Sequence, residues 1–393
     1  MKSPFPQDWK EYTIGDCLRR VEHPVEVDSD ALYTQIGIRS HGKGLFYKEP
    51  VTGELLGSKA VYWVEPDCFI LNIVFAWEQA IGKTTQAEVG MIGSHRFPMY
   101  KPVNNLIDID YLVYYLLTKR GTDILEAASP GGAGRNRTLG QDRFMKSRIV
   151  LPLLDEQQKI AKILATQDKA IELQERKIDE LKRFKKGCLE KLFPRKGQKV
   201  PEKRFPGFTD DWEQRKLGDV VQITMGQSPD GSTYSDEPSD YILVQGNADL
   251  QNGWVCPRIW TTQITKKADA GDLIMSVRAP AGAMGKTAYN AVIGRGVAAI
   301  KGNEFIYQLL VKMDADGFWK TLSCGSTFES LNSDNIKNAE VKIPTAAEQI
   351  KIGGFFQYLD NLITLHQRKL EEMEKQKKAL MQLLLTGIVR VRL

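Results

Sequence analysis

Apolar residues recur at alternating intervals of three and four positions between Glu156 and Leu192, the pattern of a long helix that packs along one face. The stretch has no proline, and its single glycine, Gly187, lies near its end. At about 1.5 Å per residue the helix would be roughly 55 Å long. Such a helix extends beyond one domain and needs a partner along its seam. The seam positions are Leu164, Gln167, Ile171, Gln174, Ile178, Leu181, Lys185, Cys188 and Leu192.

The same pattern returns 192 residues later, from Glu348 to Leu384. We therefore expect the partner helix to lie in the same chain, packed antiparallel as an intramolecular coiled coil. Gln174 and His366 occupy equivalent seam positions, and we predict that they fix the register. The pattern leaves open whether the pair serves only as a spacer or also binds other subunits with its outer faces. The second seam comprises Phe356, Leu359, Ile363, His366, Leu370, Met373, Lys377, Leu380 and Leu384.

A globular segment precedes each long helix. In the first, short β-like runs alternate with turns that carry glycine, proline or charged residues. The predicted elements are strands at Ala60–Val64, Cys68–Leu71 and Ile73–Trp77, a core helix at Tyr111–Lys119, a Gly-rich loop at Ser129–Arg137, and a last strand that begins at Ile149 and stops at Pro152.

The second globular segment reads as a diverged copy of the first. Asp8-Trp9 matches Asp211-Trp212 at an offset of 203, and Leu139 matches Leu331 at an offset of 192, so the first copy is 11 residues longer, net. Between these anchors, we match helix Tyr111–Leu117 with Phe305–Val311 and strand Cys68–Leu71 with Leu273–Ser276. The predicted fold is α+β. Its parts are a mixed α/β domain at 1–152, a long helix at 153–195, an exposed linker at 196–208, a second mixed domain at 209–344, a second long helix at 345–388 and a tail at 389–393.

Composition narrows the class of protein only a little. The 393 residues carry a net charge of +5, which is compatible with a nucleic-acid partner without requiring one. The cysteines are scattered and odd in number, which indicates reduced thiols rather than a disulfide framework or a zinc site. They are Cys17, Cys68, Cys188, Cys256 and Cys324. No apolar run approaches the ~20 residues that span a bilayer, and the first residues lack the apolar core of a secretory signal, so we expect a cytoplasmic protein.

A search for catalytic motifs finds none that is complete. Ile81–Thr84 resembles the end of a phosphate-binding loop, but Trp77 stands where the motif needs glycine. Pro130–Arg135 is rich in glycine and lacks the dinucleotide-binding spacing. The four histidines form no metal-spaced pair, there is no catalytic run typical of amino-methyltransferases, and Glu340–Lys342 has no nearby acidic partner for a nuclease site. We expect a chain that catalyses nothing alone and binds no metal.

Polar and basic side chains are instead frequent in loops of both globular segments. Arginine pairs with guanine and asparagine or glutamine with adenine, while lysine, serine and threonine contact phosphate. Any one of these residues could equally be a solvated surface or turn residue. The DNA-binding candidates in the first segment are Arg39, His41, Lys43, Lys83, Arg96, Arg135, Asn136 and Arg137. Those in the second are Gln227, Ser228, Gln245, Asn247, Arg278, Lys286, Arg295, Ser326 and Thr327.

With these features in place, the whole chain resembles the specificity subunit of type I restriction–modification systems. The most specific motif is the Pro-containing start of each long helix, Ile149–Ile160 and Val341–Ile352, which appears twice. Arg204–Trp212, Lys216–Asp219 and Gly325–Thr327 also carry the resemblance. The first segment departs from the pattern because its Gly-rich loop replaces the Gly-Ser-Thr loop of the second.

The resemblance implies a subunit that binds a bipartite double-stranded DNA target, one half-site for each target-recognition domain. It implies two methyltransferase subunits that use S-adenosylmethionine, and two restriction subunits that use ATP and magnesium. On this view the chain itself binds no cofactor. The rival hypothesis from another class is a coiled-coil adaptor with two protein-binding domains, in which the loop arginines would be spread evenly around each domain. A third is an autonomous nuclease with an unrecognised metal site.

Overall fold

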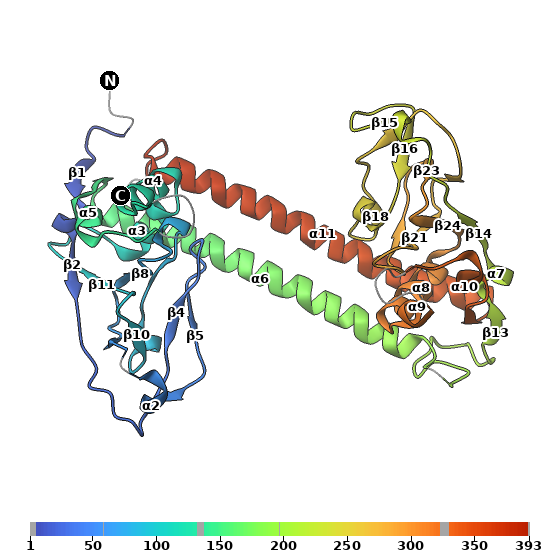
Figure 1. The fold of residues 1–393 in the computed structure, drawn as a ribbon, viewed down its shortest axis with the longest axis horizontal. Helices are drawn as coiled ribbons and strands as arrows, with labels where there is room; N and C mark the ends of the chain where they lie inside the picture. Colours follow the sequence, from blue (N-terminus) through green and yellow to red (C-terminus); the bar gives the residue numbers. More distant parts are fainter. Residues whose placement is uncertain (1–4, 58, 132–136, 196, 323–329, 392–393) are drawn as a thin grey trace. The chain divides into compact units, whose positions relative to one another are not determined.

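The computed structural model describes residues 5–57, 59–131, 137–195, 197–322 and 330–391 (Figure 1). The chain divides into two compact units, the first made of residues 1–173 with 370–393 and the second of residues 174–369. Each unit contains one globular domain together with part of each long helix. Four of the candidate residues lie outside the described ranges: Arg135, Asn136, Ser326 and Thr327.

The two long helices begin and end close to the predicted positions. Helix α6 spans Leu154–Leu192 and helix α11 spans Ala346–Leu385. Within the first unit, Gln167 Nε2 donates to the carbonyl oxygen of Met373 at 3.1 Å. Further along, Arg390, just beyond α11, bonds to Glu156 in the first turn of α6. In these contacts the residue numbers rise along α6 as they fall along α11, so the two helices run antiparallel there.

The second unit contains the same antiparallel pairing. Nε2 of Gln174 lies 2.9 Å from Nδ1 of His366 and donates to the His366 carbonyl oxygen at 2.7 Å. Further along α6, Lys185 Nζ lies 2.6 Å from Asp360 Oδ1. The antiparallel helix pair of the predicted fold class is confirmed.

Predicted seam residues are buried or half-buried along both helices. Phe356 and Leu359 belong to the core of the second unit, while Leu164 and Leu384 belong to the core of the first. The ends of each helix are therefore part of the globular cores, because the domains cover the apolar side chains there. The buried apolar seam residues are Leu164, Ile178, Leu181, Phe356, Leu359, Ile363 and Leu384, and the half-buried ones are Ile171, Cys188, Leu192, Leu370, Met373 and Leu380; the polar Gln174 is buried too.

The first domain is built on a four-stranded sheet in the order β2-β11-β8-β9. The strands are β2 (Leu18–Val21), β11 (Met99–Pro102), β8 (Phe69–Leu71) and β9 (Ile81–Lys83). The rings of Phe69, Tyr100 and Phe144 pack together beneath it, with centroids 6.0–6.3 Å apart. The helices are α1 (Ile14–Cys17), α2 (Gly53–Leu56), α3 (Ile109–Leu116), α4 (Lys119–Ala128) and α5 (Gln141–Lys146).

Two-stranded pairs complete the first domain. One of them joins the start of the chain to the strand before α6, so that the sheet and the long helix share a core. The pairs are β1 (Lys10–Thr13) with β12 (Arg148–Leu151), β3 (Leu32–Tyr33) with β6 (Val51–Thr52), β4 (Ile36–Ile38) with β5 (Leu45–Tyr47), and β7 (Val61–Trp63) with β10 (Ile92–Ser94).

The second domain has larger sheets. A six-stranded sheet has the order β14-β24-β21-β22-β18-β17, and a five-stranded one the order β15-β19-β16-β23-β20. The first comprises β14 (Gln222–Met225), β24 (Val297–Lys301), β21 (Leu273–Ser276), β22 (Met284–Lys286), β18 (Trp254–Val255) and β17 (Leu250–Gln251). The second comprises β15 (Tyr234–Ser235), β19 (Trp260–Thr261), β16 (Tyr241–Val244), β23 (Ala291–Ile293) and β20 (Lys267–Ala268). The remaining elements are β13 (Glu213–Lys216) paired with β25 (Glu340–Ile343), and helices α7 (Leu217–Val220), α8 (Glu304–Ala315), α9 (Phe318–Leu322) and α10 (Ser333–Lys337).

The order β14-β24-β21-β22 repeats the order β2-β11-β8-β9 of the first domain, with antiparallel pairing throughout. The predicted match of Cys68–Leu71 with Leu273–Ser276 corresponds to β8 and β21, and the predicted helix match corresponds to α3 and α8. The internal repeat expected from the sequence is therefore present in the sheets as well as in the long helices.

One predicted strand is wrong. Residues Ile73–Trp77 form a turn that leads into a short 3₁₀ helix, η1 (Ala76–Glu78). The Asn72 side-chain oxygen accepts the backbone N–H of Val74 at 3.1 Å, and its carbonyl accepts that of Phe75 at 3.0 Å. An asparagine that bonds to the backbone two residues on favours a turn over a strand, whatever the hydrophobicity that follows.

The linker is mostly exposed, as predicted, but Phe205 and Arg204 help to anchor it. Phe205 packs against Phe355 of α11 with ring centroids 5.9 Å apart. The Arg204 guanidinium donates to both carboxylate oxygens of Glu348, at 2.8 and 2.7 Å. This bidentate pair, with a fully buried carboxylate, attaches the linker to the first turn of α11.

Among the described residues, no helix combines the length and apolar character required to cross a membrane.

Candidate nucleic-acid interface

Four candidate residues of the second domain come together on neighbouring loops. Gln227 and Ser228 follow β14, Gln245 follows β16, and Arg295 connects β23 to β24. The Arg295 backbone N–H donates to Ser228 Oγ at 3.1 Å, and its Nε lies 3.4 Å from the same oxygen. The Gln227 N–H donates to the Ile293 carbonyl at 2.8 Å. Residues far apart in the sequence thus form one polar surface.

Glycines permit this close approach of loops. A Cβ at Gly296 would lie 2.0 Å from the carbonyl oxygen of Gln245, and one at Gly226 would lie 2.1 Å from that of Gly294. No side chain fits at either distance, so the backbones can pack against each other only because these residues are glycine. Gly294 and Gly296 therefore fix the backbone position of Arg295 between them, while the Arg295 side chain stays exposed.

A buried carboxylate organises the Gln245 loop. Asp249, at the end of the 3₁₀ helix η4 (Asn247–Asp249), is only 2% exposed. It accepts the backbone N–H groups of Gln245 at 2.7 Å and Gly246 at 3.1 Å, and it is ion-paired with Arg258. Sequence reasoning missed Arg258 because it lies in no Gly-rich loop. The only sequence signal for Arg258 was Asp249, nine positions earlier, and an acidic residue at that spacing does not by itself predict an ion pair.

The other described candidates of the second domain are Arg278, Lys286 and Asn247. Arg278 is exposed in the loop after β21 and forms an isolated β-bridge with Ser330, at the edge of the described residues. Lys286 lies in β22 with its side chain 13% exposed, and it bonds to Glu304 at 2.9 Å and sits 4.5 Å from the Tyr307 ring. This lysine is engaged inside the domain. Asn247 opens the 3₁₀ helix beside Gln245.

In the first domain, the loop between β4 and β5 carries three of the candidates. Arg39 donates from Nη1 to the Leu45 carbonyl at 2.8 Å, and its guanidinium lies 5.2 Å from the Phe46 ring centroid. His41 has a φ of 61° and donates its backbone N–H to the Glu78 carbonyl at 2.8 Å. Lys43 is exposed on the same loop. The loop is thus held against η1 while its basic side chains remain at the surface.

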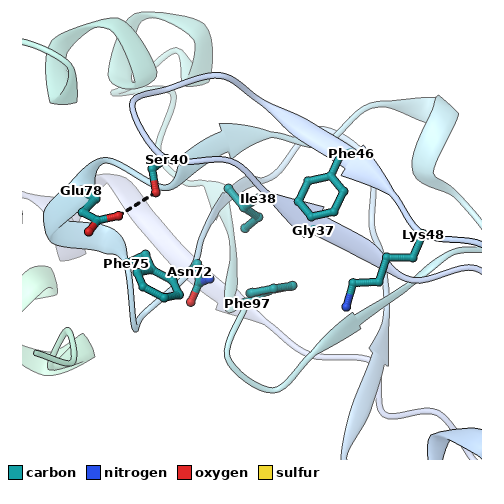
Figure 2. A pocket seen from close by; sticks show the side chains of 9 residues that line it. All are labelled: Gly37, Ile38, Ser40, Phe46, Lys48, Asn72, Phe75, Glu78 and Phe97. Carbon is teal, nitrogen blue, oxygen red and sulfur yellow. Dashed lines mark hydrogen bonds between the residues drawn. The ribbon is translucent and has the colours of Figure 1, made fainter. Parts of the chain in front are cut away.

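Beside this loop lies an open cavity of about 490 Å³ (Figure 2). At one end Ser40 Oγ donates to Glu78 at 3.0 Å, and at the other lie Phe46 and Lys48, with the rings of Phe75 and Phe97 between them. Aromatic rings and a lysine are the groups that contact bases and phosphates in nucleic-acid interfaces. The full lining is Gly37, Ile38, Ser40, Phe46, Lys48, Asn72, Phe75, Glu78 and Phe97. Candidate Arg96 directly precedes Phe97.

Lys83 occupies the place in the first domain that Lys286 occupies in the second. Its Nζ lies 2.8 Å from Asp110 Oδ2 on α3, as Lys286 bonds to Glu304 on α8. Burial acts to lower the pKa of Lys83, but the hydrogen bond and charge of Asp110 outweigh it and raise the pKa. Both lysines therefore join the end of a strand to a helix through an ion pair. The last described candidate, Arg137, lies 5.4 Å from the Trp77 ring.

The described residues contain no group of three His, Cys, Asp or Glu side chains that could hold a metal ion. Two thiols are buried and poorly suited to nucleophilic chemistry. Burial is the main cause that raises the pKa of Cys17 and of Cys68 to about 11. At neutral pH these thiols are protonated, and the thiolate is the reactive form.

Comparisons with known proteins identify the class. The family model described as "Type I restriction modification DNA specificity domain" matches residues 40–183 and 209–375. The chain belongs to this family of type I restriction–modification specificity subunits, as the sequence motifs indicated. The two matched segments correspond to the internal repeat.

Individual relatives agree with the family. A putative type I restriction enzyme MjaX specificity subunit from Methanocaldococcus jannaschii is 30% identical over 307 residues, 75% of this chain and 71% of that protein. The MjaVIII specificity subunit of the same organism is 24% identical over 431 residues, covering 98% and 94%. The crystal structure of a type I restriction–modification S subunit from M. genitalium has the same fold, with a TM-score of 0.62 at 14% identity, covering 98% of this chain and 99% of that one.

Proposed function

We propose that this chain recognises a bipartite double-stranded DNA target, with each globular domain reading one half-site, and that it brings methyltransferase and restriction subunits to that target. The observation that carries the proposal is the surface formed by Gln227, Ser228, Gln245 and Arg295 in the second domain. Glutamine and arginine are the residues that form bidentate contacts with adenine and guanine.

The internal repeat supports reading by two domains. Both units have the same sheet order and the same antiparallel helix pairing. Both also have an ion pair between a strand lysine and a helix carboxylate, Lys83 with Asp110 and Lys286 with Glu304. The candidate loops, in contrast, differ in length and residues. A shared frame with different loops suits a protein whose two halves bind different short sequences, so the proposed target need not be a palindrome.

We infer that the chain is a non-catalytic subunit. On this proposal two methyltransferase subunits bind S-adenosylmethionine, turn an adenine out of each half-site and methylate it. Two restriction subunits would use ATP and magnesium, and this chain would bind none of these cofactors. The proposed site of action is the chromosome, in the cytoplasm.

Co-expression of the chain with its methyltransferase, followed by mapping of methylated adenines on genomic DNA, tests the proposal. A split motif with a fixed gap is the expected result. Absence of any modified motif, with the complex assembled, would favour the adaptor with two protein-binding domains. Cleavage of DNA by the purified chain with magnesium alone would favour the autonomous nuclease.

A further inference from the structure

The ion pair between Asp249 and Arg258 leaves one edge of the arginine free. Nε and Nη2 of Arg258 both donate to Oδ1 of Asp249, at 3.0 and 2.7 Å. A guanidinium carries five N–H donors in a fixed plane. The bond to Asp249 uses the Nε side of that plane. The outer edge retains both hydrogens of Nη1 and one of Nη2.

That outer edge faces solvent. The Arg258 side chain is 50% exposed, although its partner carboxylate is 3% exposed. None of the hydrogen bonds among the described residues involves Nη1 of Arg258. The two parallel N–H groups of the outer edge match the O6 and N7 acceptors that guanine presents in the major groove.

The same carboxylate links Arg258 to the candidate interface. Oδ2 of Asp249 accepts the backbone N–H groups of Gln245 and Gly246, while Oδ1 accepts Arg258. The carbonyl of Gln245 in turn packs against Gly296, beside Arg295. One buried acid therefore fixes both the direction of a guanidinium and the loop that carries Gln245.

We propose that Arg258 is a specificity-determining residue that reads a guanine in the half-site of the second domain, and that Asp249 is the residue that positions it. The proposal rests on the proposed function and deepens it. An arginine held by a carboxylate has already given up its rotamer freedom before it meets DNA, so it discriminates by geometry as well as by charge. A flexible lysine at this place would contact any nearby phosphate or acceptor.

The test uses the complex of the full chain with its methyltransferase and a library of randomised DNA duplexes, and the bound duplexes are sequenced. The variants are Arg258→Ala, Arg258→Lys and Asp249→Asn, and the matched control is Lys301→Ala. Lys301 lies in the same domain, is also 50% exposed and is also ion-paired, to Asp269. Arg258→Lys keeps a positive charge beside Asp249, so it remains informative where Arg258→Ala or Asp249→Asn weakens folding.

For the wild type we expect a split motif with at least one fixed G·C pair in the half-site of the second domain. Arg258→Ala and Arg258→Lys should both reduce discrimination at one such pair by about 5- to 150-fold and leave the other half-site intact. Asp249→Asn should reduce discrimination at the same pair, and Lys301→Ala should change nothing.

An unchanged motif in both Arg258 variants would overturn the inference and leave the ion pair as a support for the fold only. Equal weakening at every position, with a smaller dependence on salt, would also overturn it, because that is the behaviour of a phosphate contact. Absence of any selected sequence in the wild type would instead overturn the proposed function itself. The two failures are therefore distinguishable.

Discussion

Lys185 of α6 and Asp360 of α11 form an ion pair between the two long helices, with Nζ 2.6 Å from Oδ1 and both side chains mostly buried. The other carboxylate oxygen of Asp360 accepts Gln308 Nε2 of α8 at 2.7 Å. One acid thus connects both long helices to the helix of the second domain. In the first unit, Asp168 is bound in the same way by Lys377 and by Tyr114, whose hydroxyl donates at 2.7 Å.

Asp360→Ala should lower the free energy of unfolding by about 2–3 kcal/mol, because it leaves a partly buried lysine and a buried amide without their shared acceptor. Chemical denaturation of the purified chain measures the difference. Lys182→Ala is the control, since Lys182 is exposed on α6 less than one turn from Lys185. A destabilisation no larger than that of the control would show that the contacts of Asp360 with Lys185 and Gln308 contribute little to stability.

The long helices could be predicted from the sequence because a 3–4 spacing sustained over many turns has one structural meaning, and the copy 192 residues later supplied the partner. The strand predicted at Ile73–Trp77 failed because a single side chain, Asn72, turns the backbone. Local chemistry overrode an apolar run there.

For the candidate interface, the sequence could predict the types of residue involved but not their arrangement. Residue type pointed to Gln245 and Arg295, but sequence could not show that their loops meet, since that depends on the close packing at Gly226 and Gly296. Sequence likewise could not show that Lys83 and Lys286 each form an ion pair with an acid on a neighbouring helix. Long-range pairing of polar side chains leaves no periodic trace in one sequence.

A second prediction concerns the helices as a spacer between half-sites. Four residues inserted between Phe184 and Gly187 add about 6 Å to a helix. The gap in the recognised motif should then grow by about one or two base pairs, at roughly 3.4 Å each. Methylation mapping in the co-expressed complex measures the gap. Four residues inserted between Gln198 and Lys199, in the exposed linker, are the control and should leave the gap unchanged. If the helix insertion also leaves it unchanged, the helices do not set the spacing.

A third prediction concerns acid stability. The side-chain hydrogen bond from Arg390, the largest contribution, lowers the pKa of Asp8 below its usual 3.8, with burial acting in the opposite direction. A lowered pKa in the folded state means that Asp8 stabilises the fold above about pH 3.8 and that this contribution disappears as the pH falls through the lowered value.

The pH dependence of unfolding checks this assignment. Between pH 5 and pH 3, the wild type should lose more stability than Asp8→Asn, whose amide has no proton to gain. Glu49→Gln, an exposed acid of the same domain, should follow the wild type. Parallel curves for the wild type and Asp8→Asn would show that the Arg390 hydrogen bond does not persist in solution.

The last prediction separates base reading from phosphate contact at Arg295. Its backbone is fixed by Ser228 and by the flanking glycines, while its side chain is exposed. Arg295→Ala should therefore relax one position of the second-domain half-site, at a cost of about 1–3 kcal/mol in discrimination. Arg278→Ala should act on the same half-site, and Arg39→Ala on the other one.

Binding of the methyltransferase complex to duplexes with single base changes, at several salt concentrations, distinguishes the two roles. If Arg295 reads a base, Arg295→Ala should flatten the preference at one position and leave the first-domain half-site intact. If Arg295 binds a phosphate, the variant should weaken binding to all duplexes alike. The slope of log K against log salt concentration should then become smaller by about one. The second outcome would leave Gln245 and Gln227 as the remaining base-reading candidates of that surface, because their amides can form bidentate contacts with adenine.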